Sequence, residues 1–435
     1  MNYVALGILV VVLGAVIARQ VLGRGPGVWA MFLAGGFVTV VSGVLPPSGA
    51  ESAVAASAPV LLFLLALFLF AGALDRAGAL DHLARWIIGR ARRAEELPVA
   101  LFVGFGVASA FLVNDALVLI GVPLLVALAA RIRLDPKPLL LVLAFSVTVG
   151  SVLTPFGNPQ NLLVSVDSGL GTPVVVFLEY LAVPTALNLA VGAWYLRRVF
   201  ARSMRAREAE FAEVRAHAPP LFPVGGWSAR IRRSPVLVVF PGTMVVLITL
   251  DIVSALTGGP AVPVWETAAG GAVLLLLLSP QRTRIVEKVD WTVLLLFAGI
   301  FVVVAGAVAG GVVQGAESVL PIPRPGNTFA TLGVLVPTSL VGSQLVSNVP
   351  WVALQIPILT GLGYGGGTPL AWVGLAAAST LAGNVTLLGA ASNLIIAQQA
   401  EKRGLSFGLG PFVRYGLPLA ALTVAILFVC LALGV

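Results

Sequence analysis

Long apolar runs, separated by short polar segments, follow one another along most of this chain. Their cores include residues 4–17, 53–73, 236–250 and 417–435. A helix needs roughly 20 apolar residues to cross a hydrocarbon core about 30 Å thick, and about ten runs approach that length. The pattern predicts an all-α polytopic membrane protein and excludes a soluble one. The first run has no Lys or Arg before Arg19, so we expect a true span there, not a signal peptide.

Basic residues gather between the apolar runs and predict how the chain crosses the membrane. Cytoplasmic loops of inner-membrane proteins carry an excess of Lys and Arg. When every cluster is placed in the cytoplasm, both chain termini lie outside, and the segment 98–130, which has basic flanks at both ends, becomes a re-entrant hairpin. The clusters lie at 19–24, 85–93, 131–137, 197–233, 282–288 and 402–403.

The same reasoning divides the chain into two inverted repeats, each of five crossings plus one hairpin. The piece at 75–93 is amphipathic and is predicted to lie along the cytoplasmic surface. The predicted parts are the first repeat at 1–200 (hairpin 98–130, broken helix 138–167), a basic cytoplasmic linker at 201–234, and the second repeat at 235–435 (hairpin 328–362, broken helix 370–399).

Short motifs recur in the two halves at the places where helices are expected to break. Asn114-Asp115 is followed by Pro123, and Ser347-Asn348 is followed at the same spacing by Pro357. Further along, the segment 150–161 aligns with the segment 382–393. The alignment superposes Thr154 on Thr386, Gly157 on Gly389 and Asn161 on Asn393.

Interrupted helices that meet at the bilayer midplane are typical of secondary transporters. Asn, Ser and Thr cap the broken ends, free N–H groups at a half-helix N-terminus attract an anion, and freed carbonyls suit sodium. The alternative is that the breaks are only kinks in packed helices. The predicted substrate- and ion-binding residues are Asn114, Asp115, Thr154, Gly157, Asn158, Asn161, Ser347, Asn348, Asn384, Thr386, Ser392 and Asn393.

Asp115 is the one carboxylate inside an apolar hairpin, where a charge costs at least about 2.5 kcal/mol. We expect it to titrate or to bind a cation, with sodium held near Asn114, Asp115 and Asn348; the alternative is an acid fixed by hydrogen bonds to the hairpin backbone. Five other acids map to external ends of spans and are interpreted as ordinary interfacial charges: Asp167, Glu179, Asp251, Glu266 and Glu317.

Composition and the absence of certain motifs argue against several other classes of function. Charged residues make up 10% of the 435 positions, and the net charge of +8 follows from the cytoplasmic clusters, so no nucleic-acid partner is expected. The single cysteine, Cys430, excludes an intramolecular disulfide. His82 and His217 lie apart, and no nucleophile, cofactor or metal motif is present, so we expect neither an enzyme nor a bound cofactor.

At the repeated motifs the chain resembles the ion transporter superfamily, which groups arsenite permeases, citrate-transporter-like permeases, sodium/proton antiporters and divalent-anion symporters. The resemblance covers nearly the whole chain. It implies a dimerising scaffold domain, and hence a homodimer, with a mobile transport domain that works as an elevator. Some arsenite permeases associate with a separate ATPase subunit, and the resemblance leaves that partner open.

In the divalent-anion symporters a Ser-Asn-Thr triplet at each hairpin tip helps hold sodium and the substrate carboxylate. The matching positions here read Val113-Asn114-Asp115 and Ser347-Asn348-Val349. An acidic residue at the tip is more similar to the arsenite and antiporter branches. We therefore expect a transporter of a small anion or metalloid oxyanion, coupled to protons or sodium. The alternatives are a sodium/proton antiporter and, further off, a channel.

Overall fold

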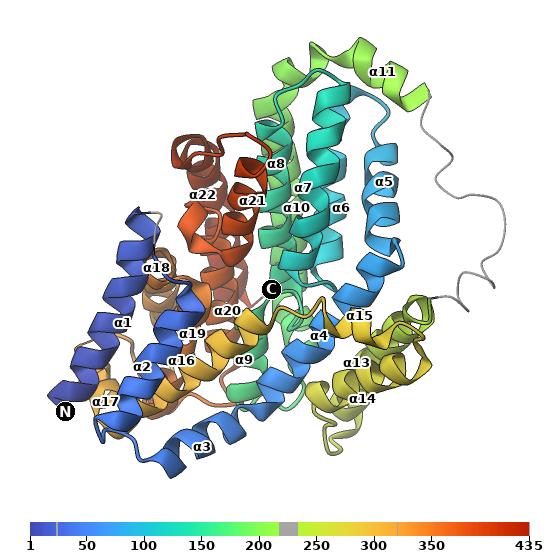
Figure 1. The fold of residues 1–435 in the computed structure, drawn as a ribbon. Coiled ribbons are helices and arrows are strands. Elements are labelled where there is room, and N and C mark those ends of the chain that lie inside the picture. The colour runs from blue at the N-terminus through green and yellow to red at the C-terminus, as the bar shows by residue number, and fades with distance from the viewer. Residues whose placement is uncertain (23–24, 217–233, 320, 435) are drawn as a thin grey trace.

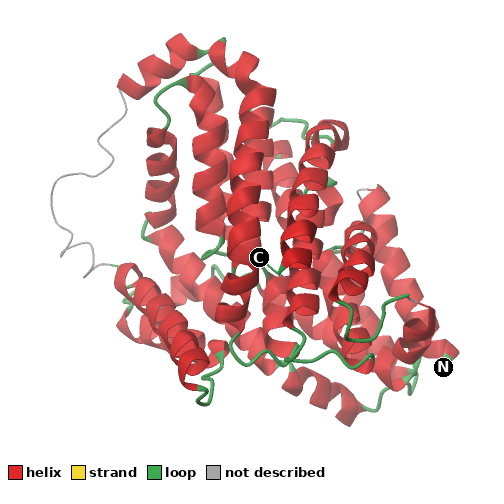
Figure 2. Cartoon of the chain, turned by 180° about the vertical axis from the view of Figure 1, so that it is seen from behind, coloured by secondary structure: helices red, strands yellow, loops and turns green. Residues whose placement is uncertain are grey.

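The computed structural model describes residues 1–22, 25–216, 234–319 and 321–434, and this part of the chain folds into helices without a strand (Figures 1 and 2). The all-helical prediction is therefore confirmed. Residues 217–233, which include His217 and half of the predicted basic linker, lie outside the described ranges.

Helices of the first half follow the apolar runs closely. They are α1 (Tyr3–Leu22), α2 (Val28–Val41), α3 (Pro47–Ala56), α4 (Ala58–Arg76), α5 (Ala79–Arg90), η1 (Ala94–Glu96), α6 (Leu97–Ser109), α7 (Asn114–Arg131), α8 (Lys137–Gly150), η2 (Ser151–Leu153), α9 (Pro159–Asp167), α10 (Pro173–Arg205) and α11 (Glu208–Ala216).

The second half repeats much of this order. It contains α13 (Val236–Thr257), α14 (Val264–Leu278), α15 (Arg282–Val286), α16 (Trp291–Ala309), α17 (Val312–Val319), α18 (Thr328–Val346), α19 (Asn348–Gly361), α20 (Pro369–Ala382), η3 (Leu387–Gly389), α21 (Ala391–Glu401) and α22 (Leu409–Leu433). Among the described residues, seven helices are long and apolar enough to cross a membrane: α4, α7, α10, α13, α16, α18 and α22.

The helices pack in two groups. In the frame group (α1, α2, α4, α13, α14, α16), α2 packs on α16 while α4 packs on α14. In the hairpin group (α6 to α10 and α18 to α22), α6 packs on α8 while α18 packs on α20, and α10 packs on α22. Contacts between corresponding helices thus recur in the two halves.

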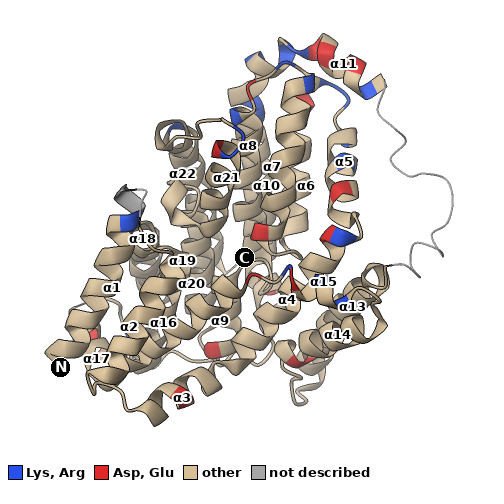
Figure 3. Cartoon of the chain, in the orientation of Figure 1, with Lys and Arg blue, Asp and Glu red and all other residues tan. Residues whose placement is uncertain are grey.

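Lys and Arg gather toward the end of the molecule that carries α11 (top in Figure 3), whereas the N-terminus lies at the opposite end. At this basic end, two arginines of α10 form ion pairs with one glutamate of η1. Arg197 Nη2 donates to Glu95 Oε1 (3.1 Å), and Arg205 donates to the other oxygen of the same carboxylate. These hydrogen bonds, that from Arg205 foremost, lower the pKa of Glu95 below its usual value.

The amphipathic piece at 75–93 differs from its prediction. Its helix, α5, runs alongside α6 and α7 (Figure 1). The apolar residues Leu80, Ala84 and Ile87 are buried, and a neighbouring glycine, Gly104, lets α6 approach Ile87. Because that face finds a protein partner, it has no need of the membrane surface.

The centre of the hairpin group is formed by α8 and α20, which are buried on every side. Every residue from Leu139 to Gly150 is buried, and so is every residue from Ala371 to Ala382. Backbone groups freed where these helices end have no access to lipid, which is the condition under which a broken helix is tolerated at membrane depth.

A glycine pair fixes the crossing of α6 and α8. A Cβ atom placed on Gly150 would overlap the backbone of Gly106, including its carbonyl group. The two backbones therefore touch directly, and no other residue type fits at position 150 without moving a helix.

We expect Gly150→Ala to destabilise the protein by about 3 kcal/mol or more, because backbone atoms cannot shift as side chains do. The matched control is Gly14→Ala on α1, where nothing lies within 4 Å of the new methyl group; helix propensity there favours Ala by about 1 kcal/mol. Thermal unfolding of the purified variants checks both. Equal melting temperatures would show that the crossing is not tight.

Candidate substrate and ion site

The first helix break lies between α8 and α9. After Gly150 the chain makes one 3-10 turn, passes through the extended residue Thr154, and begins α9 at Pro159. Asn158 is the N-cap, and its Oδ1 accepts a hydrogen bond from Asn161 N (2.9 Å). Pro159 at the first helical position leaves no N–H unpaired.

Asn161 holds this break closed. Its Nδ2 donates to Ser151 O (2.9 Å) and to Thr154 O (3.0 Å), which are carbonyls that the helix can no longer pair. Its Oδ1 accepts from Thr380 Oγ1 (3.1 Å) on α20. All polar atoms of this fully buried side chain are therefore engaged. Asn161 supports the site and leaves no atom for a ligand.

The second break, between α20 and α21, uses the same device. Asn393 Nδ2 donates to Gly383 O (2.6 Å) and reaches Thr386 O at 3.5 Å. Thr386 and Ala390 are extended, as Thr154 and Asn158 are in the first break. The aligned residues thus occupy equivalent local structures.

Each break is tied to the tip of a hairpin by its threonine. Thr154 Oγ1 donates to Ala110 O at the tip between α6 and α7. Thr386 Oγ1 donates to Gln344 Oε1 (2.7 Å) near the end of α18, and Gln344 Nε2 donates to Ala382 O (2.6 Å). Sequence reasoning missed Gln344, although it stands at the position that the repeat aligns with Ala110.

Close approach explains the glycines of both breaks. A Cβ atom on Gly389 would lie 2.8 Å from Ala382 O and 2.9 Å from Gln344 Nε2, and one on Gly157 would lie 2.9 Å from Ser109 O. Hairpin tip and break are therefore in contact on both sides of the repeat.

The hairpin asparagines are buried at the starts of α7 and α19. Asn114 lies 3.2 Å from Ser151 Oγ, and its amide nitrogen, when turned, donates to Gly157 O (3.2 Å) and Val147 O (3.1 Å). Asn348 is 4% exposed, and its Oδ1 has no hydrogen-bond partner in the described part of the chain.

The residue before Asn348 has an unusual backbone. Ser347 has φ 73° and ψ 161°, a region that is nearly restricted to glycine. Such a conformation costs about 1–3 kcal/mol and persists only where the surroundings impose it. The equivalent residue of the first hairpin, Val113, is relaxed at φ −55° and ψ 131°. The two tips therefore differ in strain.

Thr380 joins the two halves, and sequence reasoning missed it. Its hydroxyl accepts from Asn158 Nδ2 (3.2 Å) and from Gln160 Nε2 (3.1 Å), both on the first-half break. The sequence does contain an indication of its role, because the repeat alignment, when extended toward the N-terminus, pairs Thr380 with Thr148.

Buried polar atoms are satisfied very differently at the two breaks. Among the described residues, every buried side-chain polar atom of Thr154, Asn158 and Asn161 has a partner. The second break and hairpin leave several unpaired: Asn384 Nδ2, Asn384 Oδ1, Asn393 Oδ1, Asn348 Oδ1 and Ser343 Oγ. Native proteins leave few such atoms, because a buried polar group without a hydrogen-bond partner is costly.

Two remaining predicted residues lie close to these atoms in sequence. Asn384 follows Gly383 directly, whose carbonyl Asn393 binds, and it is fully buried. Ser392 is 3% exposed at the start of α21. It makes none of the hydrogen bonds that organise the break.

Asp115 occupies the first turn of α7 and lines a groove with a volume of ≈ 710 Å³. It makes no hydrogen bond or ion pair with any described residue, so the alternative of an acid fixed by hydrogen bonds to the hairpin backbone finds no support. The groove also reaches Ile395 on α21 and Phe68 on α4.

The interpretation of Asp251 as an ordinary interfacial charge is wrong. This side chain on α13 is 2% exposed, and its Oδ2 accepts from Val175 N (2.8 Å) at the start of α10. Free N–H groups at a helix N-terminus stabilise a carboxylate. Asp251 therefore links the frame group to the hairpin group, a role that hydropathy does not reveal.

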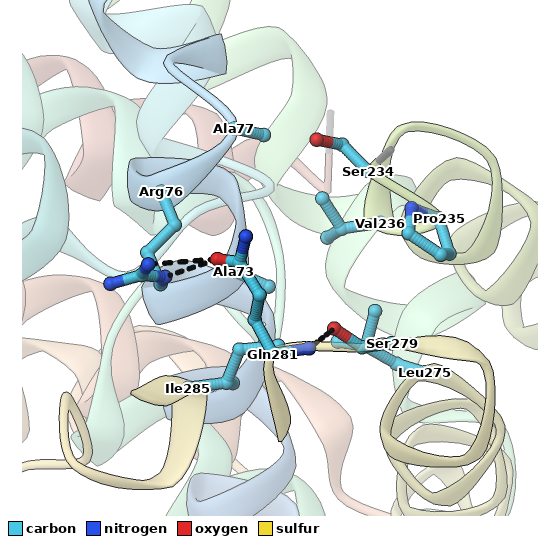
Figure 4. Close-up of a pocket in the computed structure, with 10 residues that line it drawn as sticks. All are labelled: Ala73, Arg76, Ala77, Ser234, Pro235, Val236, Leu275, Ser279, Gln281 and Ile285. Atoms are coloured by element: carbon cyan, nitrogen blue, oxygen red, sulfur yellow. Dashed lines mark hydrogen bonds between the residues drawn. The ribbon is translucent and has the colours of Figure 1, made fainter. Parts of the chain in front are cut away.

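A smaller cavity of ≈ 140 Å³ lies away from the breaks, between the ends of α4, α13 and α14 (Figure 4). Arg76 reaches across to Gln281, with Nη2 2.7 Å from Oε1. None of the predicted site residues lines it, and its volume suits a few water molecules.

Comparison with known proteins identifies the family of this chain. Residues 4–382 match the sequence profile of the citrate transporter family. The chain belongs to that family. The resemblance to the ion transporter superfamily is thereby confirmed, and the protein is a membrane transporter.

The relatives include proteins with and without a known cargo. An uncharacterized transporter of Mycobacterium bovis is 26% identical over 375 residues, covering 84% of each chain. A silicon efflux transporter of Oryza sativa subsp. japonica is 25% identical over 431 residues, covering 85% of each. The YdaH transporter of Alcanivorax borkumensis has a similar fold, with a TM-score of 0.50, 15% identity, and coverage of 88% and 87% of the two chains.

The Thr380 contact yields a direct prediction. Thr380→Val removes the acceptor that two buried amides share, so we expect a loss of stability of about 2 kcal/mol or more. Thr380→Ser should restore most of it. The repeat-matched control is Thr148→Val, because the Thr148 hydroxyl donates only to Ala144 O within its own helix. Thermal unfolding of the three proteins measures the effect, and an equal loss at both positions would contradict it.

Proposed function

We propose that this transporter is a secondary active carrier of a small anion or metalloid oxyanion, coupled to protons or sodium. The observation that supports this most directly is the set of unpaired buried polar atoms around the second break, on Asn348, Asn384 and Asn393. Amide and hydroxyl groups of this kind bind the oxygens or hydroxyls of a small solute, or a sodium ion. In water-free surroundings they are costly unless something occupies the site.

Four half-helices begin around this region and add to its chemistry. They are α7, α9, α19 and α21, and α7 packs on α21 just as α19 packs on α9. The N-terminus of each presents backbone N–H groups and the positive end of a helix dipole. An anionic or polarised oxygen is stabilised there without any Lys or Arg.

Coupling would involve Asp115, the only acid in the hairpin tips and breaks. It lies next to Asn114 and faces the groove between the frame and hairpin groups. A carboxylate without a cationic partner at membrane depth tends to take up a proton or sodium ion. Its charge would then change with each transport cycle.

The two helix groups would supply the movement. We infer an elevator in which the hairpin group, with both breaks and both tips, slides along the frame group. The Thr154 and Gln344 contacts bind each tip to its break, so the site would travel as one body. The inverted repeat and a homodimer formed through the frame group belong to the same proposal.

Relatives point to two kinds of cargo, citrate in the family description and silicon in the plant protein. Citrate carries several carboxylate oxygens, which amide and hydroxyl groups can bind. The second candidate function is a sodium/proton antiporter without such a cargo, and Asp115 is the observation that favours it. Transport in proteoliposomes separates the two, because only the first needs an added solute.

Asp115→Asn should abolish coupling while keeping the size of the side chain. We expect solute-driven proton or sodium movement to fall about tenfold or more, since a charge-assisted contact is worth at least 1.4 kcal/mol. The control is Glu266→Gln, an exposed acid outside the site, which should keep its activity. Unchanged rate and pH dependence in the Asp115 variant would end the coupling hypothesis.

Asn384 allows binding to be separated from folding. Asn384→Leu replaces two unpaired polar atoms by an apolar side chain of similar size, so stability should hold or rise while transport falls about tenfold. Asn161→Leu is the matched control, because its paired amide is structural and its loss should unfold the protein. Melting temperature and transport are measured on the same preparations. A destabilised Asn384→Leu variant would assign Asn384 to folding.

A further inference from the structure

The groove that reaches Asp115 has walls from both helix groups. Its walls are α4 and the segment before α16 in the frame group, and α7 and Ile395 of α21 in the hairpin group; α5, which packs against helices of both groups, completes the lining. Its charged lining residues are Asp75, Asp81, Arg85, Asp115, Lys288 and Asp290. Acids therefore outnumber bases in it.

After the opposite charges in the groove are paired, the excess negative charge lies on two residues. Lys288 Nζ lies 3.2 Å from Asp75 Oδ2, so these two charges cancel. Asp81 and Arg85 stand one turn apart on α5, a spacing at which opposite charges offset each other. Asp115 and Asp290 remain without a cation.

Asp290 is fixed in position by the start of α16. It is the N-cap of α16, and its Oδ1 accepts a hydrogen bond from Thr292 N (3.0 Å). The helix dipole stabilises a carboxylate at that place. Asp290 therefore adds a second carboxylate without a cationic partner to the groove, beside that of Asp115.

The hairpin tips and breaks add no compensating base. The tips and breaks at 109–115, 150–161, 343–350 and 382–393 contain no Lys, Arg or His. A free multivalent anion in this groove would lie near the two carboxylates without a cationic partner and would find no cationic side chain at the tips and breaks. Sodium, protons and uncharged solutes meet no such barrier.

We propose that this groove is the vestibule through which the site is reached from the basic, predicted cytoplasmic side, and that Asp290 makes it a charge filter. It favours cations and uncharged hydroxylated solutes over free multivalent anions. The inference rests on the proposed function for its consequence: among the proposed cargoes, it favours those that enter uncharged, such as a protonated metalloid oxyanion, over free multivalent anions. The filter itself is a property of the groove and is measurable without transport.

Thiol labelling measures the filter directly. Leu119 lines the groove and is 48% exposed, so Leu119→Cys in a Cys430→Ser background offers one reactive thiol there. Cationic and anionic methanethiosulfonates are compared at low salt, each normalised to its reaction with free cysteine. We expect the cationic reagent to react about tenfold faster, because like-signed walls concentrate counter-ions by that order.

Two further variants test whether Asp290 causes the preference for the cationic reagent. Asp290→Asn keeps an N-cap side chain and should lower the cation-to-anion ratio about threefold. Glu287→Gln removes a nearby acid that does not line the groove and should leave the ratio unchanged. The difference should vanish in about 1 M salt, where the screening length is about 3 Å. Ala127→Cys replaces the probe if Leu119→Cys does not purify as a folded protein.

An equal or anion-favouring ratio, or one that Asp290→Asn does not alter, overturns the filter whatever the protein transports. Proteoliposomes then test its consequence with uncharged arsenous acid against arsenate and citrate. A filter that is present while arsenate or citrate is the better cargo contradicts the narrowed class. Movement of none of the three solutes contradicts the proposed function instead.

Discussion

Everything in the hairpin group depends on pairing backbone carbonyls that two helices release deep inside the protein. Asn161 and Asn393 do this with side-chain amides, each donating across its break to carbonyls of the interrupted turn. Because α8 and α20 are buried on every side, neither water nor lipid can substitute. These hydrogen bonds hold the half-helices in place and thereby set the direction of their dipoles, while Thr154 and Gln344 join each break to its hairpin tip.

The two breaks have similar local structures but differ in how many of their buried polar groups are hydrogen-bonded. At the first break Thr380 from α20 satisfies Asn158, Gln160 and Asn161 together. At the second break Asn384 has no such partner, and the tip beside it carries the strained Ser347. A satisfied network rigidifies, whereas an unsatisfied one gains free energy from an occupant. We therefore interpret the first half as support and the second as the more direct binding surface.

Sequence alone predicted the helical runs, the segments that break, and the Asn, Thr and Gly residues that shape the breaks, because these follow from periodicity and local backbone chemistry. It did not predict Gln344 or Thr380, whose roles depend on packing between segments far apart in sequence. Asp251 was misread for a related reason: hydropathy places it at the end of a span, while its burial arises from the start of α10 lying against it. The difference in hydrogen bonding between the two breaks likewise depends on which segments pack against each of them in the folded protein.

The contact between Gly106 and Gly150 restricts how α6 and α8 can move relative to each other. With backbone against backbone, α6 has no side-chain layer over which it could slide or tilt relative to α8. We therefore expect α6 and α8 to move together at this crossing. In the elevator that we propose, opening on that side would arise between rigid bodies, at the boundary with the frame helices.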